Sequence, residues 1–262
     1  MIDFTQYEEI SREFLACWTL AAAYVQRLGE KNLSWFKANL YSPVLEHFSF
    51  RLGNQLFFVR LEDSEGRLKI PGNLDDLLEI SGECGGHPLV MPMKNNGGIW
   101  LPLLSGWGLL NAVTREPVNP QKLSTSEKVE MTPWELHDLA VHSVMASLGG
   151  KKIFSYTNHP DISPSVWYLG PSGVEWIIVR FRSRLQGRGS LPANWIQVCE
   201  SSLERGCGNG YFAEVSFAGR DLATGEPLEN APPRRGEDVF ISSLSMRPFV
   251  YAGRAGALAG AV

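Results

Sequence analysis

The stretch from His159 to Arg180 constrains the fold most, because it combines two strand signals with tight turns. A short strand is expected at residues 166–169, followed by the turn Gly170-Pro171-Ser172-Gly173. The next strand opens on Glu175 and continues through a strongly apolar run to Arg180. Gly, Pro and Ser are typical turn residues. The stretch therefore predicts two neighbouring strands, with Asp161 in a turn before the first strand and Glu175 at the start of the second.

Asp161 and Glu175 are the first candidate site residues. Hard divalent cations need oxygen ligands from more than one place in the chain, and two acids at the mouths of neighbouring strands can supply them. Each acid also has an ordinary explanation. Asp161 follows Pro160, as is common in turns, and Glu175 can simply be solvated at a strand start. Both interpretations stay open at this point.

Composition indicates an ordinary globular protein. The chain has 262 residues, of which 44% are hydrophobic and 11% aromatic, so it can form one large domain or two small ones. Its formal net charge of −4 gives no general attraction to a polyanion, so binding of nucleic acid would need a local basic patch. No apolar run approaches the length of a membrane span, and no secretory signal is visible at the start. Four widely spaced cysteines indicate small core residues in a reduced, cytoplasmic protein.

The chain is expected to divide into two halves. Residues 1–120 form an N-terminal α+β region, which consists of a long amphipathic helix at residues 5–28 and a β-rich segment. Thr5 and Glu8 have the spacing of a capping box at the start of this helix. Residues 119–129 are polar and contain Pro, Ser and Thr, which favours a boundary there. Residues 130–250 form the second half, and the Gly/Ala-rich residues 251–262 are expected to be a frayed tail.

The second half has a definite order of elements. A helix is predicted from Thr132 to Leu148, with Pro133 at its first position. The remaining elements follow from apolar periodicity and turn signals. They are strands at 152–157, 166–169 and 175–182, a helix at 193–204, a strand at 211–217 and a last strand at 238–241. The order is αβββαβ in a mixed α/β, or α+β, protein.

This order, together with Pro160-Asp161 and Glu175, resembles the PD-(D/E)XK nuclease-like superfamily. Pro160-Asp161 is similar to the family's "PD" at the edge of the second strand, and Glu175 to the acid that opens the third. The resemblance covers residues 132–217 and implies a restriction-endonuclease-like core. Active members are metal-dependent phosphodiesterases. The resemblance therefore implies that Asp161 and Glu175 bind Mg²⁺ or Mn²⁺. The cation would activate a water molecule and neutralise charge in the transition state.

Two further roles follow from the same resemblance. The family's lysine normally stands two residues after the second acid, where this chain has Ile177. Lys151 or Lys152, at the start of the first strand, can replace it, and Lys152 is the candidate catalytic residue. An additional metal-binding acid on the first helix would be Glu135, although Glu135 is also suited to be the capping partner of Thr132. His137 falls nearer the apolar side of this helix, and we expect it to be a hydrogen-bonded core residue. The missing lysine puts catalysis in doubt.

The chain has one basic cluster, which follows the third strand. It consists of Arg180, Arg182, Arg184 and Arg188. Arginines beside a carboxylate site can contact phosphates of a nucleic acid, or they can form a solvated strand end. Two functions therefore remain open. The first is a metal-dependent phosphodiesterase acting on nucleic acid, with Asp161, Glu175 and Lys152 as catalytic residues. The second is a catalytically inactive module that binds nucleic acid or a protein partner.

Overall fold

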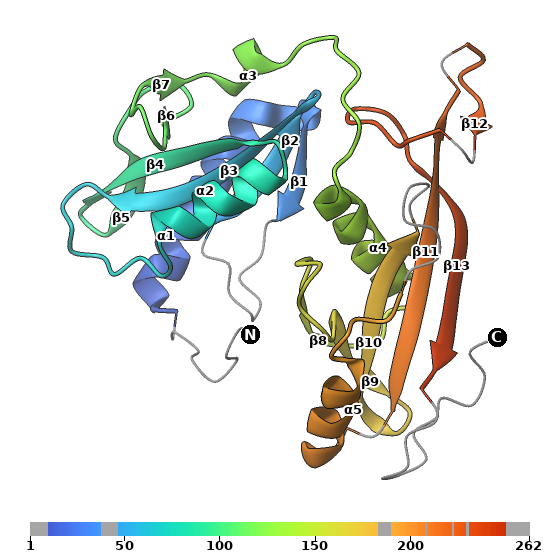
Figure 1. Cartoon of the computed structure of the whole chain (residues 1–262). Coiled ribbons are helices and arrows are strands. Elements are labelled where there is room, and N and C mark those ends of the chain that lie inside the picture. The colour runs from blue at the N-terminus through green and yellow to red at the C-terminus, as the bar shows by residue number, and fades with distance from the viewer. Residues whose placement is uncertain are drawn as a thin grey trace. The chain divides into compact units, whose positions relative to one another are not determined.

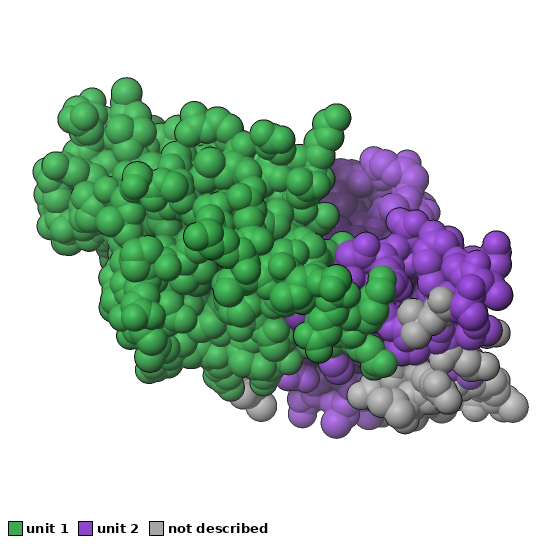
Figure 2. All heavy atoms as spheres, turned by 90° about the horizontal axis from the view of Figure 1, so that it is seen from above, with its two compact units in different colours: residues 1–132 green, residues 133–262 purple. Residues whose placement is uncertain are grey.

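The structure is a computed structural model that describes residues 10–37, 47–182, 190–207, 209–221, 223–228 and 231–249. It is a mixed α+β protein with two mixed sheets. The chain forms two compact units, Met1–Thr132 and Pro133–Val262, which Figure 2 shows in green and purple. The boundary between the units follows closely on the predicted boundary segment, residues 119–129. The tail expected at residues 251–262 lies outside the described residues.

Unit 1 is built on a seven-stranded sheet. The strands are β1 (Leu33–Lys37), β2 (Phe48–Leu52), β3 (Gln55–Asp63), β4 (His87–Asn96), β5 (Ile99–Pro102), β6 (Leu109–Asn111) and β7 (Pro117–Val118). Their order is β1-β2-β3-β4-β6-β7, and β5 pairs with β4. Only the β3–β4 pair is parallel, and the chain between these strands forms helix α2 (Leu74–Glu83). A parallel pair needs such a crossover, because a tight hairpin turn can join only antiparallel strands.

Helix α1 (Arg12–Gly29) buries one face against this sheet. Its N-cap is Ser11, whose hydroxyl accepts a hydrogen bond from the backbone N–H of Phe14 at 3.0 Å. The predicted capping box at Thr5 and Glu8 lies outside the described residues. The short helices η1 (Glu30–Asn32) and α3 (Pro120–Leu123) complete the unit. The described helices of the chain include none that is long and apolar enough to cross a membrane.

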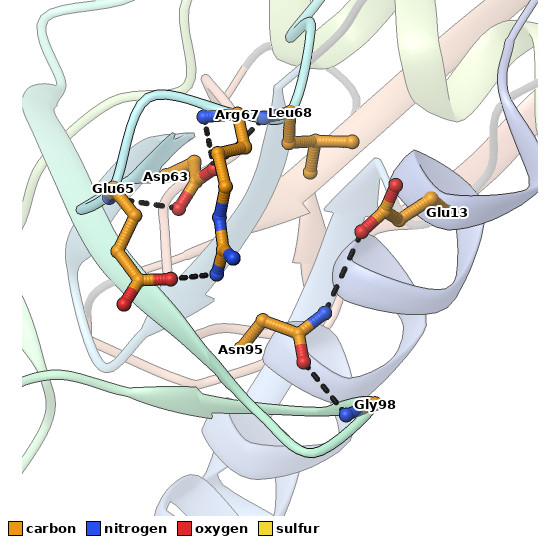
Figure 3. A network of polar contacts seen from close by, with 7 residues as sticks. All are labelled: Glu13, Asp63, Glu65, Arg67, Leu68, Asn95 and Gly98. Carbon is orange, nitrogen blue, oxygen red and sulfur yellow. Dashed lines mark hydrogen bonds and ion pairs between the residues drawn. The ribbon is translucent and has the colours of Figure 1, made fainter.

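Two polar side chains order the turns next to α1 in unit 1 (Figure 3). The carboxylate of Asp63 accepts three backbone N–H bonds at 2.7–2.9 Å, from Glu65, Arg67 and Leu68. Asn95 accepts the N–H of Gly98 at 2.8 Å and donates to the carboxylate of Glu13 on α1 at 3.5 Å. These bonds satisfy backbone donors that strand pairing leaves free, so the two side chains have a structural role.

Unit 2 contains α4 and α5 and a six-stranded sheet (Figure 1). Its elements are α4 (Pro133–Ser147), β8 (Ile153–Tyr156), β9 (Val166–Gly170), β10 (Gly173–Arg182), α5 (Trp195–Glu204), β11 (Gly210–Arg220), β12 (Pro227–Leu228) and β13 (Phe240–Pro248). The predicted order helix, three strands, helix, strand is confirmed. The sheet order is β12-β11-β10-β9-β8, and β13 pairs with β11. Only β10 and β11 are parallel, and α5 forms the crossover between them.

Strand β10 is the centre of unit 2, and its apolar run is buried on both faces. Trp176 and Ile178 pack with Phe212 of β11 and with Val198 and Cys199 of α5. The alternate residues of the run are also fully buried. The four cysteines of the chain are buried thiols, which confirms their prediction as small core residues.

Candidate functional site

The register of the β9–β10 hairpin decides where the two predicted acids lie. The strands are joined by the two-residue turn Pro171-Ser172, and Glu175 pairs with Tyr168 close to that turn. The two strands are antiparallel. The residues that precede β9 in the chain therefore lie next to the C-terminal end of β10, its far end, away from Glu175. The hairpin thus directs Asp161 and Glu175 toward different parts of the strand.

Asp161 lies beside Arg180, near the far end of β10. The guanidinium of Arg180 donates to the hydroxyl of Ser163 at 3.3 Å, and the charge of Asp161 acts on it. Arg180 is five residues after Glu175, which corresponds to roughly 16 Å along a strand. The structure therefore does not bring Asp161 and Glu175 together.

Glu175 is a buried carboxylate with hydrogen-bond donors on both oxygens. Glu175 is 1% exposed, and its carboxylate accepts hydrogen bonds from the Tyr168 hydroxyl at 2.7 Å and from the Asn209 amide at 3.1 Å. Burial alone would raise the pKa of Glu175. The two donors, a backbone N–H of the preceding turn and nearby Lys151 outweigh burial and lower that pKa below its usual value. A Cβ atom at Gly170 would lie 2.0 Å from this carboxylate, so the pocket for Glu175 requires glycine there.

The lysine close to Glu175 is Lys151. Its ammonium lies 5.1 Å from the centre of the Tyr168 ring, whereas Lys152 lies 5.3 Å from the ring centre of the exposed Phe154. Successive side chains of an extended segment point to opposite sides, which explains the difference between the two lysines. Lys152, predicted as the replacement for the lysine of the motif, is thus associated with the surface residue Phe154. Ile177 is fully buried.

Glu135, the predicted third metal ligand, forms a buried ion pair with Arg235. The Nε of Arg235 lies 3.1 and 3.0 Å from the two carboxylate oxygens, and its terminal nitrogen lies 2.9 Å from Oε2. The side chains are 3% and 4% exposed. The charge of the carboxylate is therefore already balanced by a guanidinium. Nothing in the local sequence around Glu135 indicates Arg235 as a partner, because the two residues are one hundred positions apart.

A second acid of α4, Asp138, is hydrogen-bonded within the unit. It accepts a bond from the Asn158 amide at 3.0 Å, and the imidazole of His142 lies 3.4 Å from the same oxygen. The hydrogen bond and charge of Asp138 outweigh burial and raise the pKa of His142. The described residues include no group of three or more His, Cys, Asp or Glu side chains arranged to hold a metal ion.

Unit 2 has a cavity of about 640 Å³ at the far end of β10. Its wall includes His137, Asp161, Arg180, Phe181, Pro192 and Asn194. Asp161 and Arg180 were both predicted as site residues, and this cavity brings them together. Arg182 is exposed at the end of β10, and Arg184 and Arg188 lie outside the described residues.

His137 lines this cavity although the sequence did not indicate it as a site residue. It is 0% exposed, and within the part of the chain that the structure describes neither ring nitrogen has a hydrogen-bond partner. Burial, reinforced by the positive charge of Arg180 and by His159, lowers the pKa of His137 to about 3. The ring is therefore neutral near pH 7. The expectation of a core residue is confirmed, but the expected hydrogen bond is not found.

Arg180 and the start of α5 add positive potential to the cavity. Burial lowers the pKa of Arg180, an effect that Asp161 partly opposes. Its guanidinium uses one N–H on the backbone oxygen of Val179 at 2.8 Å and another on Ser163. Asn194, the N-cap of α5, lines the cavity and makes no side-chain cap bond. The N-terminal end of a helix carries a partial positive charge.

These features define unit 2 as a mixed α+β domain with a polar cavity whose wall carries both Arg180 and Asp161. A family model described as "Domain of unknown function (DUF8840)" matches residues 134–246, which fall within this unit. No curated protein matches the chain significantly. No solved structure matches it significantly either.

Proposed function

We propose that unit 2 is a binding module that holds a small polar ligand in the cavity beside Asp161 and Arg180. The observation that carries this proposal is His137, a buried residue of the cavity wall whose imidazole has no hydrogen-bond partner among the described residues. An unsatisfied buried polar group costs about 1–3 kcal/mol. A ligand that bonds with the ring would recover this cost on binding.

The dimensions and chemistry of the cavity agree with a small-molecule site. Its volume of about 640 Å³ is in the range of ligand pockets, and its wall combines prolines and Phe181 with a few polar groups. Arg180 supplies donors, Asp161 supplies an acceptor, and the neutral ring of His137 can do either. Such a set can orient one ligand through several hydrogen bonds.

The placement of the acids favours binding over metal-dependent hydrolysis. A shared catalytic cation would need the carboxylates of Asp161 and Glu175 within reach of each other. Glu175 accepts hydrogen bonds from Tyr168 and Asn209, while Asp161 lies beside Arg180. Each of the two carboxylates therefore has its own set of neighbours, and these sets suit separate roles.

Ligand-observed NMR with a library of polar fragments tests the binding proposal. We expect a subset of fragments to bind the wild-type protein and to lose affinity by about tenfold or more in Arg180→Gln, because a charge-assisted hydrogen bond is removed. Arg182→Gln is the matched control, since this exposed arginine follows on the same strand and does not line the cavity. If every fragment binds Arg180→Gln and Arg182→Gln with the same affinity, the proposal is contradicted.

A plasmid-nicking assay with Mg²⁺ or Mn²⁺ tests the alternative function. We expect no nicking above background by the wild-type protein. Nicking that disappears in both Asp161→Asn and Glu175→Gln would show that the two acids act together, and the hydrolase would then replace the binding module.

A further inference from the structure

The first turn of α5 and Arg180 act on the same cavity. Pro192, Ala193 and Asn194 line the cavity, and α5 begins directly after them. A helix N-terminus is equivalent to roughly half a positive charge, and Arg180 adds a full one. Two independent sources of positive potential therefore converge on this part of the wall.

The backbone donors at the start of α5 are available to a ligand. Trp195 donates its N–H to the oxygen of Pro192 at 3.0 Å, and Val198 donates to Asn194 at 3.1 Å. Within the described residues, no hydrogen bond is found for the N–H groups of Ile196 and Gln197. Free N–H groups at a helix N-terminus are a common binding site for phosphate groups.

His137 is the second and independent indication of a ligand. It is fully buried, it belongs to α4 rather than α5, and it is one of the residues that line the cavity. Among the described residues, neither ring nitrogen has a hydrogen-bond partner. A neutral imidazole has one N–H that can donate to an anionic oxygen. The same anion would thus meet donors from α4, from β10 and from α5.

Asp161 restricts the type of anion. Its carboxylate lines the same cavity and repels a bare anion, so a good ligand must present a hydrogen-bond donor at that point. We infer that the cavity binds a small phosphate monoester that also carries a hydroxyl or amino group. The phosphate contacts Arg180, His137 and the start of α5, and the donor group contacts Asp161. This inference rests on the proposed binding function and names its ligand class.

Calorimetric titration of the full chain with inorganic phosphate and with glycerol 3-phosphate tests the inference. We expect glycerol 3-phosphate to bind more tightly than inorganic phosphate, because its hydroxyls reach Asp161. Arg180→Gln is expected to weaken both ligands by about tenfold or more. Asp161→Asn is expected to remove the advantage of glycerol 3-phosphate while phosphate binds as well as before or better. Arg182→Gln should leave both affinities unchanged.

Ala193→Glu provides a second route to the same result. Ala193 is exposed, so the substitution should not disturb folding, but it adds a carboxylate at the start of α5. We expect it to abolish binding of both ligands, and circular dichroism checks the fold of every variant. If cavity-dependent fragments bind but neither phosphate ligand displaces them, the inference is overturned while the binding function stands. If no fragment depends on the cavity, both are overturned.

Discussion

His137 shows how one residue can indicate a binding site. Neither nitrogen of this buried imidazole has a partner among the described residues, which is unfavourable for stability, and an apolar side chain of similar size would avoid the cost. Its neighbours Arg180 and His159 further disfavour protonation. The residue thus lowers stability in the ligand-free protein, which is typical of groups that serve a site.

His137→Leu is therefore expected to stabilise the protein, increasingly so at acidic pH. The unfolded chain protonates this histidine near its usual pKa of 6.5, whereas the folded protein does so only at about 3. Between these values the unfolded state binds more protons, so the wild-type loses stability as pH falls, at up to about 1.4 kcal/mol per pH unit. Leucine removes this contribution. Urea unfolding of both proteins between about pH 7 and about pH 4 measures the difference, and a difference independent of pH would contradict the assignment.

At the scale of elements, most of unit 2 could be predicted from its sequence. The apolar run in β10, the proline at the first position of α4 and the Gly and Pro turns carry strong local signals, and they yielded the observed order of elements. The arrangement of the site could not be predicted in the same way. It depends on the register of the hairpin, because a two-residue turn sets Glu175 opposite Tyr168 and leaves Asp161 beside Arg180.

The Glu135–Arg235 ion pair gives a prediction about how elements are joined. It connects α4 to the segment before β13, and both side chains are almost fully buried. Removal of the arginine takes the ion-pair partner from the buried carboxylate of Glu135, so Arg235→Met is expected to cost about 3–5 kcal/mol of unfolding free energy. The double variant Glu135→Met/Arg235→Met should recover much of this loss. Denaturant unfolding of the three variants measures the coupling, and strictly additive losses would contradict the pairing.

At the scale of the whole molecule, the segment that leads to unit 2 is held by Asn54. This buried residue donates to the Thr125 hydroxyl and to the backbone oxygen of Glu127, both at 2.9 Å, and accepts the N–H of Thr125 at 3.0 Å. Asn54 belongs to the turn between β2 and β3, so unit 1 fixes the chain shortly before Pro133. The predicted boundary segment is therefore bound to unit 1.

Asn54→Ala should release this segment without altering the cavity. We expect faster amide exchange in peptides that cover residues 124–132, and a loss of about 1–3 kcal/mol for unfolding of unit 1, because the three hydrogen bonds between Asn54 and this segment disappear. Peptides of α4 and β10 should exchange at the wild-type rate. Hydrogen exchange followed by mass spectrometry measures both regions, and equal protection of residues 124–132 in the two proteins would contradict this role of Asn54.

The ion pair of Glu135 also affects the order of events during synthesis. Glu135 leaves the ribosome one hundred residues before Arg235, when β8 to β11 have not yet been made. Until residue 235 emerges, the glutamate lacks the guanidinium with which it forms its buried ion pair. The carboxylate of Glu135 on the first helix of unit 2 therefore stays hydrated until nearly the whole unit has been synthesised, and the helix can reach its final position only then.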